Sequence, residues 1–297
     1  MKRKTISHDL NRPDTHNSND LHSPILKAPA LDTELLTSFL IKVVATGSVL
    51  VLASLAAERA GVLIAGLIIT LPLNVGPGFF FVAQEVDADF LMQSALMSFT
   101  ATAAVHTYTT AYAHASTRFK GFWSTWLAAV CVWGVVAYPL VTSKPGFVTA
   151  SIIVALGFAL ANLLRYRGHD QKGSGDKAKR QGGIGFLLIR AVIGGSAVAT
   201  AATFAQSLGP ALTGLAFAFP VMMSANAWML YTSYSPEFSA ATISNARNGL
   251  ASYASFCYAM AILPAYVPSM TAWSLAVVIS ILASLLLAGV RRWRRAI

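Results

Sequence analysis

The stretch from Lys42 to Pro72, KVVATGSVLVLASLAAERAGVLIAGLIITLP, returns without gaps from Arg190 to Pro220 as RAVIGGSAVATAATFAQSLGPALTGLAFAFP, 148 residues later. Nine of these 31 positions are identical, where so Ala-, Leu- and Gly-rich a composition would give about three by chance. Many membrane transporters are built by duplication of a hydrophobic unit. The repeat therefore predicts two related halves. The identical pairs are Val44/Val192, Gly47/Gly195, Ser48/Ser196, Ala53/Ala201, Ala57/Ala205, Gly61/Gly209, Gly66/Gly214, Leu67/Leu215 and Pro72/Pro220.

The composition is typical of a helical membrane protein. The chain is 55% apolar and only 11% charged, and its mean hydropathy is positive, whereas about a quarter of a soluble domain is charged. Several apolar runs exceed the roughly 20 residues that cross a bilayer core. They are too continuous for the alternating strands of an outer-membrane barrel. We therefore expect an all-α polytopic membrane protein whose surroundings are the lipid bilayer.

The net charge of +10 does not indicate a nucleic-acid partner. The basic residues cluster in the N-terminal tail, in the loop 165–180 and in the last seven residues, 291–297. Basic flanks beside apolar spans set topology and contact anionic lipid headgroups. We expect those headgroups, and not nucleic acid, to be the partners of the basic segments.

Apolar runs separated by Pro, Gly, Ser and charged clusters predict nine transmembrane helices. The offset of 148 pairs the first four spans with the last four and leaves the fifth as a linker. Four spans return the chain to its starting side, so one linker span would invert the second repeat; one span more or fewer would make the repeats parallel. The predicted spans are 36–57, 61–83, 90–113, 121–141, 147–165, 185–206, 209–232, 243–264 and 270–290.

This organisation divides the chain into a tail, two membrane repeats and the segments that join and follow them. The tail is polar and is expected to be disordered. The expected units are the tail 1–34, repeat one 35–141, the linker helix 142–166, a basic cytoplasmic loop 167–183, repeat two 184–290 and a basic tail 291–297.

Charges near the span ends favour an N-terminus outside and a C-terminus in the cytoplasm. In that orientation Arg59, Arg118, Lys120, the basic loop and the C-terminal arginines all face the cytoplasm. The basic residues 2–4 argue for the opposite orientation, but they lie far from the first span.

Helix-breaking residues recur at matching places in the two repeats. TLPLNVGPGFFF places Pro72, Asn74 and Gly76 within span two, and AFPVMMSANAW places Pro220, Ser224 and Asn226 in the same frame. Irregular backbone at membrane depth persists where it is buried in protein or lines a wet cavity. Paired breaks are a sequence pointer to a substrate site. The alternative is a packing kink, since Pro and Gly are common in membrane helices.

Span three carries a polar side chain at every fourth position, Ser94, Ser98, Thr102, His106, Thr110 and His114. Such a stripe can pass protons or hydrogen-bond a solute, and His106 near mid-span is the candidate for that role. The hydroxyls are expected mainly to bond their own backbone.

Basic residues within the spans are candidates for holding an anion. Arg247 in span eight is one, and Lys42 and Arg190 occupy equivalent positions in the two repeats. For a basic residue one turn into a span, extension of the side chain to the membrane surface is the default expectation. The occurrence of Lys42 and Arg190 in both repeats indicates either a symmetric role or a shared topological anchor.

No hydrolase, kinase or nucleotide-binding motif occurs, and the spans offer no carboxylate pair or triad. Cys131 and Cys257 are isolated in apolar runs, which is not a metal-ligand spacing. We therefore expect no enzyme activity, no catalytic residues, no metal and no cofactor.

Each half shares a short pattern: a basic residue, a Gly five positions on, then Gly-Leu and a Pro five positions after that Leu. It reads Lys42, Gly47, Gly66-Leu67, Pro72 and again Arg190, Gly195, Gly214-Leu215, Pro220. This resembles the start of the small four-span bacterial inner-membrane proteins of the GlpM type. The resemblance implies two such units in tandem, joined by a linker span. Together with the compact loops, it indicates a bacterial inner membrane.

The sequence thus predicts a secondary transporter or permease for a small neutral or anionic solute. The site would lie near the bilayer midplane and use Pro72, Asn74, Gly76, His106, Pro220, Ser224, Asn226 and Arg247. A non-transporting envelope scaffold is the alternative, and a lipid-modifying membrane enzyme ranks third. The small-residue faces also allow a homo-oligomer.

Overall fold

The computed structural model describes residues 33–59, 72, 75–164, 184–246 and 249–296. The regular structure of these residues is helical throughout. Most of the predicted tail, the basic loop 167–183, Asn74 and Arg247 lie outside the described residues. The helices are α1 (Thr33–Arg59), α3 (Val75–Glu85), α4 (Ala88–Ala115), α5 (Phe122–Ser143), α6 (Phe147–Leu163), α7 (Ile184–Thr203), α8 (Ala205–Ala218), α9 (Val221–Ser233), α10 (Pro236–Ala246), α11 (Leu250–Met260), the short 3-10 helix η2 (Leu263–Ala265) and α12 (Ser269–Ala296).

In the described part of the chain, five helical segments are long and apolar enough to cross a membrane. The all-helical membrane class is confirmed at this level. The apolar helix Phe147–Leu163 is shorter than these five. The five segments are Thr33–Ala56, Phe122–Ser143, Gly185–Thr203, Ala205–Ser233 and Ser269–Leu287.

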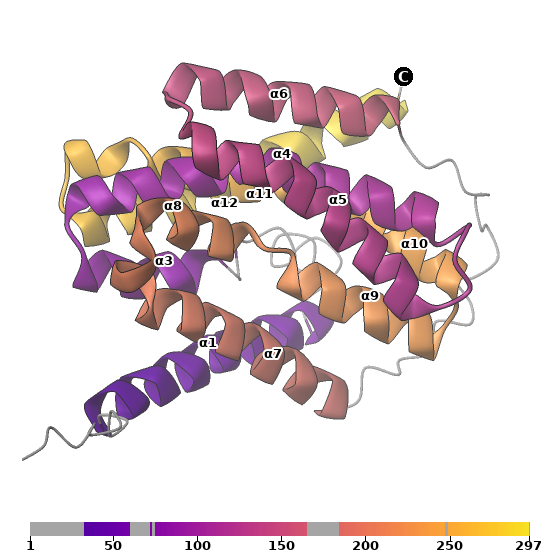
Figure 1. Ribbon diagram of the computed structural model, residues 1–297, viewed down its shortest axis with the longest axis horizontal. Coiled ribbons are helices and arrows are strands. Elements are labelled where there is room, and N and C mark those ends of the chain that lie inside the picture. The colour runs from indigo at the N-terminus through magenta and orange to yellow at the C-terminus, as the bar shows by residue number, and fades with distance from the viewer. Residues whose placement is uncertain (1–32, 60–71, 73–74, 165–183, 247–248, 297) are drawn as a thin grey trace, which may run out of the picture.

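Helix α4 lies at the centre of the molecule. It packs against α5, α6, α8, α10 and α11 and is buried along most of its length. In Figure 1, α6 runs above it, α5 crosses in front of it towards the lower right, and α1 and α7 cross at the bottom of the view. Because protein surrounds α4, it can carry many Ser and Thr residues. The hydroxyls of Thr100 and Thr109 donate to the carbonyls of Leu96 and His106, at 2.7 and 2.9 Å.

Proline and serine start the helix α10 earlier than the sequence predicted. The segment around Pro236 was expected to be a loop, with a span beginning at 243, but α10 begins at Pro236. Ser235 accepts a hydrogen bond from the Phe238 N–H at 3.1 Å, which is an N-cap, and proline at the first helical position has no N–H to leave unpaired. Helix α10 ends at Ala246, and helix α11 begins at Leu250.

Helices α1 and α7 cross at two glycines. A methyl group on Gly195 would lie 2.7 Å from the carbonyl oxygen of Val43, and one on Gly47 would lie 3.4 Å from that of Ala191. Gly47 and Gly195 are 148 residues apart, and so are the residues that they contact, Val43 and Ala191. Each helix therefore makes the equivalent contact with the other. Small residues at such a crossing let membrane helices approach closely.

The substitution Gly195→Ala should lower the free energy of unfolding by about 1–3 kcal/mol, because its methyl group would meet a main-chain carbonyl that cannot move aside. Thermal unfolding in detergent micelles would measure the change. The matched control is Gly134→Ala within α5, where no atom lies within 4 Å of the added methyl group. A Gly195→Ala variant as stable as the control would contradict the close crossing.

Candidate functional site

The helix break at Pro220 is a tight turn between α8 and α9. Phe219 is extended, with φ −63° and ψ 130°, and Pro220 has φ −78° and ψ 48°. The Val221 N–H donates to the Phe219 carbonyl at 2.7 Å, which makes this an inverse γ-turn. In a continuous helix that N–H would bond the Phe217 carbonyl. At the Pro220 break it bonds the Phe219 carbonyl instead.

A second irregularity lies upstream in α8. Gly209 has φ 74°, which breaks the helical path directly before Pro210. Glycine adopts this left-handed conformation without steric cost. The Thr213 hydroxyl donates to the Ala205 carbonyl across the kink at 3.0 Å, so the freed backbone is partly satisfied by a side chain.

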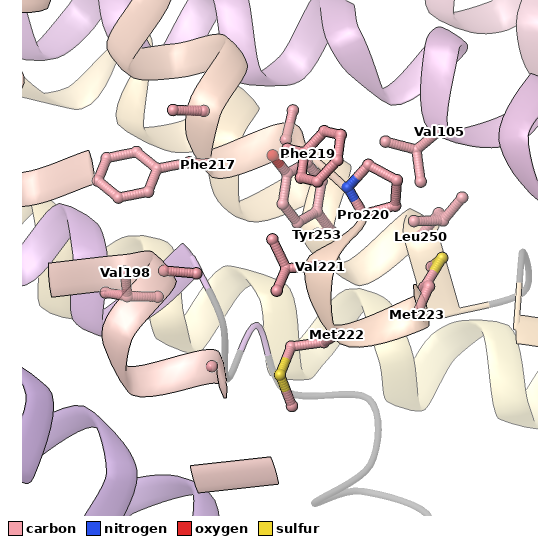
Figure 2. A pocket seen from close by; sticks show the side chains of 14 residues that line it. Val105, Val198, Phe217, Phe219, Pro220, Val221, Met222, Met223, Leu250 and Tyr253 are labelled. Carbon is pink, nitrogen blue, oxygen red and sulfur yellow. The ribbon is translucent and has the colours of Figure 1, made fainter. Parts of the chain in front are cut away.

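A cavity of about 80 Å³ opens beside the Pro220 break. Figure 2 shows Phe217, Phe219, Pro220 and Tyr253 among the side chains around it. Its walls come from four places: α4, α7, the α8–α9 break and α11. Among the described lining residues, Tyr253 has the only hydroxyl and no side chain is charged.

Pro72, the counterpart of Pro220 in the repeat, also lines a cavity. Pro72 is buried, and its carbonyl accepts the Gly76 N–H at 2.7 Å. The indole N–H of Trp273, from α12, donates to the Gly76 carbonyl at 2.8 Å. Pro72, Gly76 and Trp273 line a cavity of about 380 Å³, together with Thr46, Val49 and aromatic residues of α3.

Ser224 links the Pro220 turn to the central helix. Its hydroxyl donates to the Pro220 carbonyl at 2.8 Å and lies 3.0 Å from the Tyr108 hydroxyl. Since the one proton of Ser224 is used on Pro220, Tyr108 must be the donor to Ser224. One turn further along α4, Tyr112 contacts Ser239 at 3.0 Å in the same way, and Ser239 donates to the Ala227 carbonyl at 2.8 Å. Two Tyr–Ser pairs thus hold α4 against α9 and α10.

His106 lies in a different cavity. It is 2% exposed, and its ring meets that of Phe158 edge-on, with the centroids 5.5 Å apart. With Thr110 and His114 it lines a space of about 310 Å³ between α4, α5 and α6. The walls that α5 and α6 contribute are apolar: Val132, Leu160, Ala161 and Leu164.

The four-residue stripe on α4 does not stay on one face. Each step of four residues turns the side chain by about 40° around the helix, so Ser94 and His106 differ by about 120°. Ser98 faces α8, where its hydroxyl donates to the Gly214 carbonyl at 2.7 Å. The other end of the stripe faces α5 and α6.

The structure therefore distributes the predicted site residues over three places. Pro220 lines the 80 Å³ cavity, and Ser224 is bonded to its carbonyl. Asn226 lies partly buried on α9, two residues beyond Ser224. The 380 Å³ cavity brings together Pro72 and Gly76, and His106 lines the third cavity.

The two equivalent basic residues have different surroundings. Lys42 is 4% exposed, and its ammonium group lies 2.7 Å from a carboxylate oxygen of Glu85. It is therefore paired with a carboxylate that is itself 39% exposed, at the end of α3. Position 233, the counterpart of Glu85, is a serine. The Arg190 Nε is buried and makes no hydrogen bond with the described residues.

Sequence reasoning missed the tyrosines. Tyr108 and Tyr112 lie on α4 between the positions of the Ser/Thr/His stripe, and Tyr253 falls in the predicted span 243–264, where Arg247 was the named candidate. The available signal was the spacing of Tyr108 and Tyr112, four residues apart, which places both side chains on one helical face.

Comparisons with known proteins add no relative. No family model matches the chain, and neither the curated proteins nor the solved structures include a match. The resemblance of each half to the GlpM type stays a prediction.

The substitution Tyr108→Phe should lower the free energy of unfolding by about 1 kcal/mol, because it removes one buried hydrogen bond to Ser224. Combined with Ser224→Ala it should cost less than the sum of the single changes. Thermal unfolding in micelles measures both. Tyr138→Phe, at a residue 72% exposed on α5, is the matched control; an equal loss there would refute a specific Tyr108–Ser224 bond.

Proposed function

We propose that this protein is a secondary transporter or permease for a small neutral or anionic solute, built from two inverted repeats. The solute site lies at the paired helix breaks near the bilayer midplane. The observation that carries the proposal is that Pro72 and Pro220, at equivalent positions of the repeat, each line a cavity.

The helix boundaries support the repeat. Adding 148 residues to α3, α4 and α5 gives 223–233, 236–263 and 270–291, and the observed segments are α9 at 221–233, α10–α11 at 236–260 and α12 at 269–296. One local hydrogen bond also recurs at this offset. The Asp87 carboxylate caps the Phe90 N–H as Ser235 caps Phe238.

The directions of the helices support inversion. In Figure 1, α1 runs from left to right and α7 from right to left, and α5 and α12 also run in opposite directions. The Gln206 side chain donates to the Glu85 carbonyl at 2.8 Å, and the Tyr231 hydroxyl to the Lys120 carbonyl at 3.1 Å. Each bond joins two turns that the predicted topology assigns to the same membrane face.

The two cavities share equivalent lining residues. Thr46, Val49 and Pro72 line one, and Gly194, Ala197 and Pro220 line the other, all at the offset of 148. Their volumes differ, about 380 against 80 Å³. Unequal openings at equivalent places are expected of a transporter that exposes its site to one side at a time.

The alternatives fit these observations less well. A scaffold has no need of cavities at helix breaks, and solid packing is the expectation for it. A lipid-modifying enzyme would need a histidine beside further reactive groups at headgroup level. The cavity of His106 and His114 has two threonines, but no carboxylate among its described lining residues.

The transporter proposal predicts water at the Pro220 break. In a background lacking Cys131 and Cys257, Ala197→Cys should react with a membrane-impermeant thiol reagent, applied to intact cells or to inside-out vesicles. Ala199→Cys and Val192→Cys should not react, because Ala199 is fully buried and Val192 is 60% exposed on the outer, apolar face of α7. An Ala197→Cys variant that stays unlabelled from both sides would favour the scaffold.

The orientation predicts a second labelling pattern in the same background. Gln84→Cys, beside the acidic turn, should label in intact cells, and Ser174→Cys, in the basic loop, only in inside-out vesicles. The reverse pattern would place the N-terminus in the cytoplasm. If both cysteines were labelled from the same side, the proposed inversion of the two repeats would be wrong.

A further inference from the structure

The ion pair of Lys42 and Glu85 lies at the edge of an open space. Both side chains line this space, which has a volume of about 570 Å³ and lies between the start of α1 and the end of α3. Because the Glu85 side chain is 39% exposed, a solute that enters the space can contact the carboxylate directly. The other described lining residues are mostly polar and include Glu34, Ser38 and Gln84.

This polar space adjoins the apolar cavity at Pro72. Phe80 and Phe81 of α3 line both spaces. Lys42 lies one helical turn, about 6 Å, before Thr46 on α1, and Thr46 lines the apolar cavity. None of the described residues that line the apolar cavity is charged. A molecule only a few bonds long can therefore contact the ion pair at one end and the apolar cavity at the other.

The packing that the two halves share does not require this ion pair. Helices α7 and α9, the counterparts of α1 and α3, contact each other, although Ser233 stands at the position equivalent to Glu85. Removing two charges from water is costly, and well-packed apolar residues often stabilise a fold equally well. A role in binding explains why the first half contains the pair.

The pair restricts the charges of a ligand. An anion that bound Lys42 in place of Glu85 would leave the carboxylate without its partner, and a cation that bound Glu85 in place of Lys42 would leave a buried ammonium group unpaired. The loss of one partner from such a pair is strongly unfavourable. A zwitterion supplies both charges together, so each member of the pair exchanges one opposite charge for another.

We propose that the groove formed by these two spaces binds an apolar α-amino acid. Its ammonium group pairs with Glu85, its carboxylate pairs with Lys42, and its side chain enters the cavity at Pro72. A cavity needs about 10–15 Å³ for each water molecule when measured in this way, so the observed 380 Å³ accommodates the side chain of leucine or phenylalanine. The inference rests on the proposed transport function and narrows its solute to a zwitterion, which is neutral overall.

A zwitterionic phospholipid such as phosphatidylethanolamine also combines an ammonium group and an acid with an apolar remainder. The amino acid fits better, because the ion pair and the apolar cavity lie only about one helical turn apart. In a phospholipid, the glycerol and ester groups separate the charges from the acyl chains. The phospholipid is therefore a contrary outcome of the test.

The experiment follows protection of a Val277→Cys reporter from alkylation by N-ethylmaleimide, in the purified full-length protein without Cys131 and Cys257. Val277 lines the apolar cavity from α12 and is partly buried. Leucine should slow alkylation about twofold or more once its concentration reaches the dissociation constant. A Thr117→Cys reporter, in the exposed turn after α4, corrects for effects of each probe on the reagent.

Three relatives of leucine separate the parts of the ligand. Isopentylamine is leucine without its carboxylate, isocaproate is leucine without its ammonium group, and glycine has both charges but no apolar side chain. At the concentration at which leucine protects the reporter, none of the three should protect it.

Glu85→Gln should abolish protection by leucine. Asp89→Asn is the matched control, because it removes the same charge at an exposed residue that lines neither space. Thermal unfolding in micelles establishes whether both variants are folded. The leucine relatives need no change at the ion pair, so they test the proposal even if Glu85→Gln does not fold.

Protection by isopentylamine or isocaproate as strong as that by leucine would overturn the zwitterion, and protection that survives Glu85→Gln would overturn the role of the ion pair. Protection by phosphatidylethanolamine in mixed micelles, with none by leucine, would make the groove a lipid site and overturn the proposal.

The proposed transport function is tested separately by labelling of Ala197→Cys. If Val277→Cys is never alkylated, or if leucine leaves it unprotected, the inference is wrong whatever Ala197→Cys shows. If leucine protects Val277→Cys but Ala197→Cys stays unlabelled from both sides, the binding site is confirmed and the transport function is wrong.

Discussion

Where α1 crosses α7, two main chains approach each other with no side chain between them, at Gly47 and Gly195. In lipid there is little hydrophobic driving force for helix association, so close packing of small residues must hold the helices together. Helices α3, α8 and α9 in turn pack on α7, so this pair positions the break between α8 and α9. A side chain at Gly195 would separate the helices, and the cavity walls that α7 contributes at Gly194 and Ala197 would move with it.

Much of the helical layout could be predicted because Pro, Gly and charged residues end apolar runs in both sequence and structure. Spans predicted at 121–141 and 147–165 are α5 and α6, with ends at most two residues away. The break at Pro220 follows from the ring chemistry of proline. The start of α10 was missed, because Ser235 and Pro236 look like a loop but cap and begin a helix.

The arrangement of the site could be predicted less well, because it depends on how helices rotate and pack. A period of four on a helix of 3.6 residues per turn drifts round the axis, so the stripe of α4 divides between α8 and the His106 cavity. The Tyr108–Ser224 bond joins residues 116 apart in the chain, and no local pattern specifies such a pairing. The internal repeat could align Lys42 with Arg190, but only the fold brings Glu85 to Lys42.

The burial of α4 has a consequence for how the protein is made. A helix so rich in Ser, Thr and His enters lipid reluctantly when it leaves the insertion machinery by itself, and here its shelter comes partly from α8, α10 and α11 of the second half. In the nascent chain, α4 is therefore incompletely covered until the helices of the second half have been synthesised. Helix α4 therefore depends on the second half of the chain for part of its cover.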